Sequence, residues 1–356
     1  MKSNEADLAR QIIGDIRSHS TRPVRLMEFC GGHTVAILKH GLRQLLPSTV
    51  KLFSGPGCPV CVTATGDLDK IIALAKLPGV IIASFGDLLR VPGSYSSLQQ
   101  ARAEGADVRI VYSALEALDL ARLYPAKKVV MVGIGFETTA PTIAASVLQA
   151  QEEGLRNYLV FSFHKLTPPV MKAILDAGEA HINGIICPGH VSAIIGSRPY
   201  EFIPRDYGIA CVVAGFEPVD ILLTVDMLVN QIESGRPKVE IAYRRAVRPE
   251  GNARALETLD RVFAVTAADW RGIGVVAQSG LKLKPVFSAF DAERTFKLEV
   301  PQVREPAGCL CGEILRGLKT PADCRLFKQT CTPEHPVGPC MVSAEGACSA
   351  YNLYGE

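Results

Sequence analysis

Short apolar runs that alternate with amphipathic stretches are the feature that most restricts the fold of this chain. The runs are four to seven residues long, rich in Val and Ile, and bounded by Gly or Pro. Such runs are typical of strands that are buried on both faces. We predict strands at Val24–Phe29, Val50–Ser54, Val80–Phe85, Val108–Tyr112, Lys128–Gly133, Tyr158–Phe163, Gly184–Cys187 and Ala210–Ala214.

Helical patterns lie between these strands, at Asp67–Lys76, Ser113–Leu123, Thr142–Glu153 and Pro168–Ala177. Alternation of strands and helices predicts right-handed βαβ units and parallel sheets. The chain has 356 residues, too many for one ordinary core. We therefore predict an α/β fold with two similar parallel-sheet lobes, residues 1–125 and 126–235, each built from four consecutive strands. Ligands of such sheets bind at the carboxyl ends of the strands.

The pattern changes after Gly235. Lys238–Arg245 is strand-like and Asn252–Val262 is helical, but the rest is rich in Gly, Pro and Cys and has little periodicity. A segment of this kind buries little apolar area and needs a stabilising cross-link, such as a metal cluster. We predict that residues 236–356 form a smaller Cys-rich C-terminal domain that holds an iron–sulfur cluster.

Charge and hydropathy exclude several classes of function. The net charge of +2 gives no electrostatic case for a nucleic-acid partner. The first 22 residues lack the apolar core of a signal peptide, and no apolar run reaches the roughly 18 residues of a membrane span. The odd count of eleven cysteines argues against a secreted disulfide framework. We expect a soluble, cytoplasmic protein whose clustered cysteines serve metal or redox chemistry.

The first cysteine motif is Cys30-Gly31-Gly32-His33-Thr34, directly after the first predicted strand. Its glycines allow a tight turn and close approach of a ligand to the backbone. The helix that follows should favour the Cys30 thiolate through its dipole, and His33 could hydrogen-bond the sulfur or move protons. The alternative is a buried structural cysteine with Thr34 as a helix cap.

The second motif is Gly55-Pro56-Gly57-Cys58-Pro59-Val60-Cys61, after the second predicted strand. A C-x-x-C pair brings two sulfurs close enough for a disulfide or a shared metal. Thioredoxin-like redox sites share this spacing. Because the first two parallel strands should be neighbours, Cys30, Cys58 and Cys61 could converge at one sheet edge. Three soft thiolates would suit a low-spin iron or another soft metal.

Three further strand ends carry polar residues. Asp87 and Arg90 follow the third strand and could orient a ligand or form a structural ion pair. Glu137 lies in a glycine-containing turn after the fifth strand, which resembles an anion-binding loop but is neither a dinucleotide fingerprint nor a Walker loop. Cys187 and His190 could form a metal pair, although a buried cysteine and a loop histidine is the favoured interpretation.

The tail carries the strongest signal in the chain, with Cys309, Cys311, Cys324, Cys331, Cys340 and Cys348. Zinc would favour paired C-x-x-C knuckles, which are absent from this segment. Iron–sulfur clusters tolerate more irregular spacing. Four of the six sulfurs would ligate a cluster, and the other two could form a disulfide or exchange electrons with it. Zinc and plain disulfides are the alternatives.

Five motifs together resemble the HypD hydrogenase maturation family, in the order of that family and over nearly the whole chain. They are the Cys30 and Cys58–Cys61 motifs with Phe29 before the first, Gly135-Phe136-Glu137-Thr138-Thr139-Ala140-Pro141, Cys187-Pro188-Gly189-His190, and Pro339-Cys340-Met341-Val342-Ser343-Ala344-Glu345-Gly346-Ala347-Cys348.

The resemblance implies a scaffold on which the Fe(CN)2CO group of [NiFe]-hydrogenases is built. Proteins of this family act with a small chaperone, HypC, and receive cyanide from HypE, whose C-terminal cysteine carries it as thiocyanate. Carried over to this chain, Cys30 and Cys61 become the iron-holding thiolates and Cys58 their redox or ligand partner. His33 is then a proton relay beside Cys30. Asp87 and Glu345 are weaker candidates for the same cleft.

The family pattern C-x14-C-x6-C-x16-C maps onto Cys309, Cys324, Cys331 and Cys348 as ligands of a [4Fe-4S] cluster. Cys311 and Cys340 are then left as a redox pair near the cluster. A ligand set that begins at Cys311 instead of Cys309 stays open.

These implications suggest a route in which a cluster feeds electrons through a dithiol to Cys58–Cys61 during cyanide transfer. An iron–sulfur-dependent thiol–disulfide reductase acting through Cys58–Cys61 is the main alternative. A second is an iron–sulfur lyase with one open iron site. Whether the protein is an enzyme or a scaffold that acts once per iron group is left open by the sequence.

Overall fold

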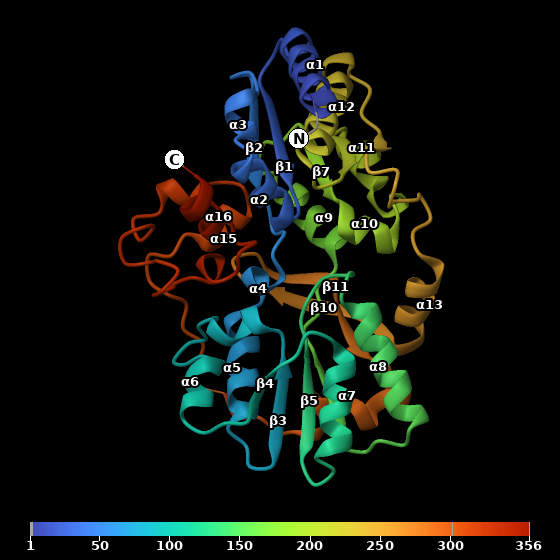
Figure 1. The fold of residues 1–356 in the computed structure, drawn as a ribbon, viewed down its shortest axis with the longest axis vertical. Coiled ribbons are helices and arrows are strands. Elements are labelled where there is room, and N and C mark those ends of the chain that lie inside the picture. Colours follow the sequence, from blue (N-terminus) through green and yellow to red (C-terminus); the bar gives the residue numbers. More distant parts are fainter. Residues whose placement is uncertain (1–2, 301, 356) are drawn as a thin grey trace.

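The chain forms two α/β lobes stacked along the long axis of the molecule, with a C-terminal segment packed against one side (Figure 1). This computed structural model describes residues 3–300 and 302–355. The predicted fold class, two parallel-sheet lobes with a cysteine-rich C-terminal part, is confirmed. We call the lobe that contains α1 the upper lobe and the lobe that contains β5 the lower lobe, as they stand in Figure 1.

The upper lobe holds a five-stranded parallel sheet in the order β2-β1-β7-β8-β9. Its strands are β1 (Val24–Glu28), β2 (Val50–Ser54), β7 (Gly184–Pro188), β8 (Ala210–Ala214) and β9 (Val239–Ile241). Every residue of β7 and β8 is buried, as expected of strands covered on both faces. Helices α1 (Ser3–His19) and α12 (Pro218–Ser234) run side by side over this lobe (Figure 1).

The lower lobe holds a four-stranded parallel sheet in the order β4-β3-β5-β6. Its strands are β3 (Val80–Ser84), β4 (Val108–Ile110), β5 (Lys128–Gly133) and β6 (Tyr158–Ser162). The helices that accompany them are α5 (Thr65–Ala75), α6 (Leu98–Ala103), α7 (Ala114–Leu123) and α8 (Ala140–Glu152).

The membership of the two sheets differs from the prediction. We expected consecutive strands to share a lobe, with a division near residue 125, but β1 and β2 pair in a sheet with β7 and β8, and β3 and β4 with β5 and β6. The chain therefore leaves the upper lobe after β2 and returns to it at β7. The β9 strand also joins the upper sheet instead of a C-terminal domain that begins at 236. Strands buried on both faces have similar sequences, so local pattern does not encode which strand pairs with which.

The remaining helices are short, and several of them start at the strand ends that carry the motifs. They are α2 (Gly31–Lys39), α3 (Leu42–Leu45), α4 (Pro59–Val62), α9 (Thr167–Ala177), α10 (Gly189–Ile195), α11 (Phe202–Tyr207), α13 (Ala253–Val262), α14 (Ala292–Thr295), α15 (Cys311–Leu315) and α16 (Ala347–Tyr354). Within the described residues, no helix is both long enough and apolar enough to cross a bilayer.

An antiparallel hairpin, β10 (Phe263–Trp270) and β11 (Gly274–Leu283), lies between the lobes and was not predicted. Its register shifts between Thr266 and Ala268, and Val265 lies on its exposed face, so the sequence shows no apolar alternation that would have signalled a strand. Trp270 is buried and forms an isolated bridge with Thr63, just after α4. The hairpin thus braces the segment that carries Cys58 and Cys61.

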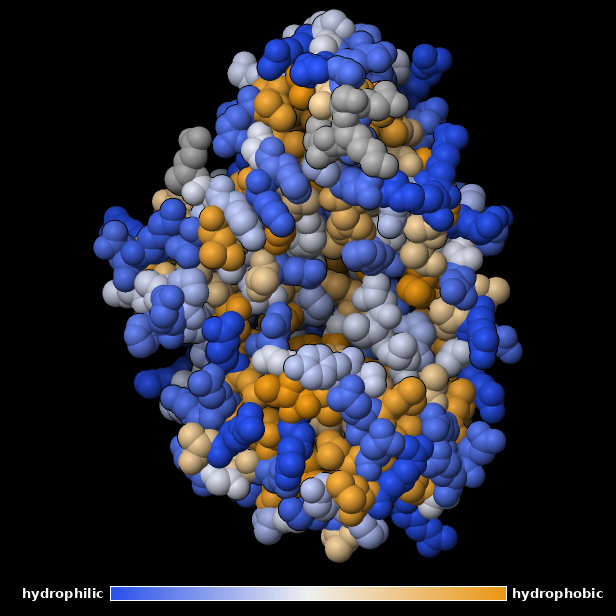
Figure 2. All heavy atoms as spheres, viewed as in Figure 1, coloured by the Kyte–Doolittle hydropathy of each residue, from blue (hydrophilic) through white to orange (hydrophobic). Residues whose placement is uncertain are grey.

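The two sheets turn the ends where their strand order reverses toward each other. In the upper sheet the reversal falls between β1 and β7, and in the lower sheet between β3 and β5. Such switch points open a crevice beyond the carboxyl ends of the strands, where doubly wound sheets bind ligands. Helix α4 lies between the lobes at this level (Figure 1), and the face seen in Figure 2 is hollowed near its middle.

Candidate functional site

Cys30 lies in the turn between β1 and α2, and its side chain does not cap the helix. Cys30 is the N-cap residue of α2, and its carbonyl accepts hydrogen bonds from the N–H groups of His33 (2.9 Å) and Thr34 (3.2 Å). Its own N–H donates to Glu28 Oε2 at 3.0 Å, and its side chain makes no capping hydrogen bond. The backbone is therefore fixed, and the thiol of this partly exposed residue takes part in no disulfide.

Three segments meet at this turn because two glycines allow contact. A Cβ atom at Gly57 would lie 2.4 Å from Cys30 Cα, and one at Gly31 would lie 2.3 Å from the carbonyl oxygen of Glu345. The Gly31 N–H also donates to Gly57 O at 3.1 Å. The Cys30 turn, the loop before Cys58 and the tail segment at Glu345 thus pack backbone against backbone. This confirms the predicted approach of the first two strand ends.

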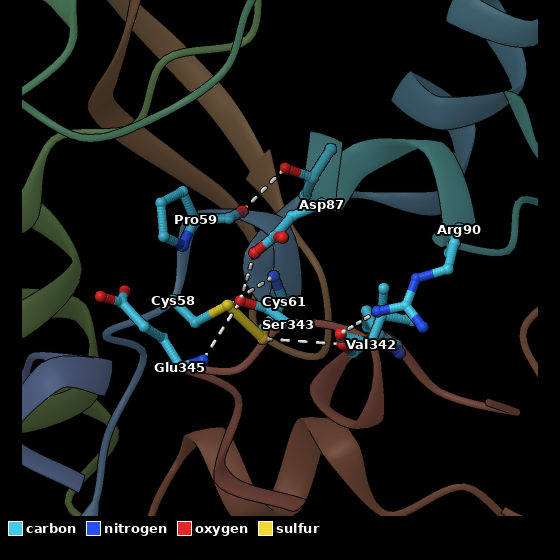
Figure 3. The surroundings of a disulfide bond; sticks show 10 residues. Cys58, Pro59, Cys61, Asp87, Arg90, Val342, Ser343 and Glu345 are labelled. Carbon is cyan, nitrogen blue, oxygen red and sulfur yellow. Dashed lines mark hydrogen bonds between the residues drawn. A yellow bond between two sulfur atoms is a disulfide. The ribbon is translucent and has the colours of Figure 1, made fainter. Parts of the chain in front are cut away.

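The C-x-x-C pair forms a disulfide, which lies beside Asp87, Ser343 and Glu345 (Figure 3). Cys58 is the N-cap residue of α4, and its sulfur accepts a hydrogen bond from the Cys61 N–H at 3.3 Å. Both cysteines are buried, and Cys61 Sγ lies 3.9 Å from the carbonyl oxygen of Pro339 in the tail. The disulfide therefore lies next to the cysteine-rich segment.

Asp87 and Arg90 hold the tail against the lower lobe and are not paired with each other in the described chain. Ser343 Oγ donates to Asp87 Oδ2 at 3.0 Å, and Arg90 Nη2 donates to the carbonyl oxygen of Val342 at 3.1 Å (Figure 3). The pKa of Glu345 is raised, first because protein atoms desolvate its carboxyl group and then because the charge of Asp87 opposes its ionisation. Both carboxyl groups thus face the cleft near the disulfide.

The electrostatics of Cys30 contradict the expectation that the helix dipole favours its thiolate. The pKa of Cys30 is raised to about 12, chiefly because burial desolvates the thiolate, and further because the carboxylates of Glu345 and Glu28 repel it. A dipole at the start of a nine-residue helix is too weak to offset these effects. At neutral pH the Cys30 side chain is therefore a thiol, and a cation bound beside it would favour the thiolate.

Glu28 was missed by the sequence analysis. It is the last residue of β1 and is buried, and it accepts hydrogen bonds from the Cys30 N–H and from Thr34 Oγ1. Burial raises the pKa of Glu28 to about 8, so this carboxyl group is mostly protonated at neutral pH. A charged residue at the end of a buried strand, two positions before Cys30, was the signal that could have identified it.

His33 lies in the core and not at the surface of the cleft. Its ring stacks on Phe216 at 4.6 Å between centroids, and neither ring nitrogen has a hydrogen-bond partner among the described residues. Burial lowers the pKa of His33 to about 4. The ring is therefore neutral at pH 7, and its role as a proton relay stays a prediction.

Glu137 and Cys187 serve the fold. The Glu137 carboxylate accepts hydrogen bonds from Thr167 N (2.7 Å) and Thr167 Oγ1 (2.9 Å), so it fastens the start of α9. Cys187 Sγ lies 3.0 Å from Cys211 Sγ on the neighbouring strand and is fully buried. His190 instead stacks on Phe216 at 3.8 Å. The preferred interpretation of Cys187 as a buried cysteine is thus confirmed, whereas His190 lies in the first turn of α10 and not in a loop.

Five tail cysteines line one small cavity, namely Cys309, Cys311, Cys324, Cys331 and Cys348. Apolar side chains, among them Ile314 and Phe327, complete its wall. Among the described residues, no three His, Cys, Asp or Glu side chains are arranged to hold a single metal ion. A four-iron cluster needs no such common point, because each ligand binds a separate iron atom. The donor set and the apolar shell therefore fit an iron–sulfur cluster.

The cavity includes both Cys309 and Cys311, so either can complete the four-cysteine set. Cys340 is fully buried and lies outside the cavity wall, beside Cys311. Hydrogen bonds from the thiols of Cys309, Cys340 and Cys348 lower the pKa of Cys311. The structure thus brings together the predicted redox pair, Cys311 and Cys340, and places it next to Pro339, which contacts Cys61.

Fold and site together define a two-lobed α/β protein with a thiol-based site between the lobes. A family model named HypD, described as "Hydrogenase formation hypA family", matches residues 7–355. The chain is 50% identical to the hydrogenase expression/formation protein HupD of Azotobacter chroococcum over 357 residues, which cover 98% of this chain and 94% of that protein. It is 47% identical to the hydrogenase maturation factor HypD of Escherichia coli over 336 residues, or 94% and 90% of the two chains.

The chain therefore belongs to the HypD family of hydrogenase maturation factors. The hydrogenase maturation factor HypD of Azotobacter vinelandii, 49% identical over 98% of this chain and 94% of its own length, is a further relative. The resemblance on which the sequence analysis relied is confirmed.

Proposed function

We propose that this chain is the scaffold on which the Fe(CN)2CO group of [NiFe]-hydrogenases is assembled. The observation that supports this most is the packing of Cys30, with its free thiol, directly against the Cys58–Cys61 loop and the Glu345 segment. Iron is cargo in this proposal, held by the thiolates of Cys30 and Cys61. Thiolates are soft, electron-rich donors, which suit an iron atom that also carries cyanide and carbonyl ligands.

The disulfide gates this binding site. While Cys61 is bonded to Cys58, it has no thiolate to offer to iron. Reduction takes two electrons and two protons and releases both sulfurs. The neighbouring Cys30 thiol loses its proton when iron binds, because a cation removes the electrostatic cost of the buried anion. The two ligands thus become available through different events, one redox and one coordination.

Delivery of cyanide from a thiocyanate requires two electrons, which a dithiol can supply. We propose that a HypE-type partner brings cyanide as a thiocyanate on its terminal cysteine and that a HypC-type chaperone binds at the same cleft. Release of cyanide anion and a thiol from a thiocyanate breaks one S–C bond and consumes two electrons and one proton. Oxidation of the Cys58–Cys61 dithiol to the disulfide supplies two electrons and two protons, and the second proton leaves to solvent. Cys61 becomes available to hold iron again once this disulfide is reduced.

The tail is proposed to hold a resident [4Fe-4S] cluster through Cys309, Cys324, Cys331 and Cys348, with Cys311 as the alternative to Cys309. Such a cluster supplies or accepts single electrons when it is bound. Cys311 lines the cavity and lies beside Cys340, which directly follows Pro339, and the carbonyl oxygen of Pro339 lies 3.9 Å from Cys61 Sγ. This placement supports the role of Cys311 and Cys340 as a redox pair.

A thiol–disulfide reductase is the second candidate, favoured by the disulfide and its contact with the tail. This function needs Cys58 and Cys61 but not Cys30. The two proposals therefore differ in what they require of one residue.

Complementation of a strain that lacks its own HypD-type protein separates the two proposals. We expect Cys30→Ala to abolish hydrogenase activity while exchange between Cys58–Cys61 and a reporter dithiol continues. Cys187→Ala is the matched control, because it removes a buried cysteine that contacts only the fold, and it should retain activity. Full hydrogenase activity with Cys30→Ala would contradict the scaffold and favour the reductase.

A further inference from the structure

Phe216 fills the crevice at the switch point of the upper sheet. It follows β8 by two residues, and its ring lies between the turn after β1 and the turn after β7. A Cβ atom at Gly32 would lie 3.1 Å from Phe216 Cε1, and one at Gly189 would lie 3.1 Å from Cε2. Each of the two motifs thus has a glycine where this ring approaches. The place where such sheets bind ligands holds an aromatic side chain here.

A histidine covers each face of this ring. His33 stacks on Phe216 at 4.6 Å and 24°, and His190 stacks on it at 3.8 Å and 19°. Two rings stacked this closely on a third must lie on its opposite faces. Tyr243 meets the ring nearly at right angles, 6.1 Å away. Phe216 is thus held on both faces and from a third side.

This column of three rings runs from the core to the surface of the protein. His33 is fully buried, Phe216 is half-buried and His190 is exposed. The column also stands beside the free thiol, because the same Cβ position at Gly32 is 3.6 Å from Cys30 Sγ and 3.1 Å from Phe216. The exposed histidine therefore has an anchor close to the proposed iron ligand.

We propose that Phe216 is a positioning residue that holds the His190 ring at the mouth of the Cys30 site, where its N–H donates a hydrogen bond to a cyanide ligand of the iron cargo. This inference rests on the function proposed above. An exposed imidazole on its own samples several rotamers, and ordering it costs entropy. Stacking on a fixed ring removes much of that freedom before the cargo arrives.

An iron-bound cyanide is a suitable acceptor for the N–H group of His190. The nitrogen of an iron-bound cyanide carries a lone pair, and a buried acceptor without a partner is costly. A neutral imidazole always has one N–H to donate. The oxygen of a carbonyl ligand is a much weaker acceptor. A hydrogen bond at this point should therefore change the cyanide stretching frequencies and leave the carbonyl frequency almost unmoved.

Infrared spectra of the cargo-loaded complex with its small partner test this inference through a double-mutant cycle. We expect Phe216→Leu to shift the cyanide bands with little change in the carbonyl band, and His190→Phe to shift them equally. The double variant should show no further shift. If Phe216 acts only by positioning His190, its substitution has no effect once the His190 hydrogen bond is already lost. Phe216→Tyr keeps the ring and should restore the wild-type bands.

Phe202→Leu is the matched control, because Phe202 is also partly buried and meets Tyr207 edge-on in α11, away from the two motifs. It should leave all bands unchanged. Unshifted cyanide bands in His190→Phe, in which Phe216 is retained, would overturn the inference even if Phe216→Leu does not fold. Additive shifts in the double variant would also overturn it. A wild-type complex without any cyanide or carbonyl band would overturn the proposed function itself.

Discussion

Close approach of backbone segments explains more of this site than any single side chain does. Cys30 lies beside the tail and the second loop because Gly31 and Gly57 let these segments come within contact of its turn. The cysteines and the glycines could be identified from the sequence, but Glu28 and Phe216 were missed. Phe216 lacks a motif of its own and only the fold brings it to Cys30, whereas Glu28 lies two positions before Cys30 in the sequence.

A side chain at position 57 would separate these segments. We expect Gly57→Ala to lower the free energy of unfolding by about 1–3 kcal/mol, because its Cβ atom would overlap the Cys30 backbone 2.4 Å away. Denaturant unfolding measures the change. Gly14→Ala in α1 is the control, since no atom lies within 4 Å of its Cβ position. It should raise stability by about 0.5–1 kcal/mol. A Gly57→Ala protein as stable as the wild type would contradict the packing.

Glu137 should make stability depend on pH. Burial raises the pKa of Glu137 from 4.5 to about 7, so the folded state binds its proton more tightly than the unfolded state does. The stabilisation is therefore complete below about pH 4.5 and is lost as the pH rises through about 7. The loss amounts to roughly 3 kcal/mol for a shift of this size.

Glu137→Gln provides the comparison, because an amide keeps a partner for both Thr167 groups and does not ionise. We expect the free energy of unfolding of the wild type to fall relative to that of the variant between pH 4.5 and pH 7. Denaturant titrations at several pH values measure this difference. Parallel curves for the two proteins over that range would show that Glu137 does not titrate there.

At the scale of helices and strands, the local sequence predicted well where the strands lie and predicted poorly which strands pair with each other. All eight predicted strands are present, because apolar runs between Gly and Pro report burial directly. The helix predicted at Asn252–Val262 is α13. The β10–β11 hairpin escaped notice because apolar residues such as Val265 and Val275 lie on its exposed face, so the sequence does not alternate between apolar and polar residues.

The tail shows why a ligand set cannot be chosen from spacing alone. Cys309 and Cys311 both line the cavity, separated by one residue. We expect Cys309→Ser to lose the cluster and Cys311→Ser to keep about four irons per chain, as the family pattern implies. Iron and sulfide analysis with electron paramagnetic resonance measures this. Cys211→Ser, remote from the cavity, is the control. Loss of iron from Cys311→Ser alone would assign the cluster to the other set.

At the scale of the whole molecule, the candidate site depends on how the chain passes between the lobes: it leaves the upper lobe after β2 and returns to it at β7. The β1 and β2 ends carry Cys30 and the Cys58 loop, the β3 end carries Asp87, and the tail adds Ser343 and Glu345. Two sheets whose switch points face each other therefore share one cleft. The sequence could not show that β1 and β2 pair with β7 and β8, because these pairs join segments that are far apart in the chain.

We propose above that Cys30 holds an iron atom with cyanide and carbonyl ligands in this cleft. Infrared spectroscopy of the anaerobically purified protein with its small partner tests this proposal most directly. We expect bands of metal-bound CN and CO that are present in the wild type and absent from Cys30→Ala, while the iron content of the proposed tail cluster is the same in both. Bands that persist in Cys30→Ala would contradict the assignment of Cys30. Their absence from the wild type, with the Cys58–Cys61 disulfide still cycling, would contradict the scaffold as a whole.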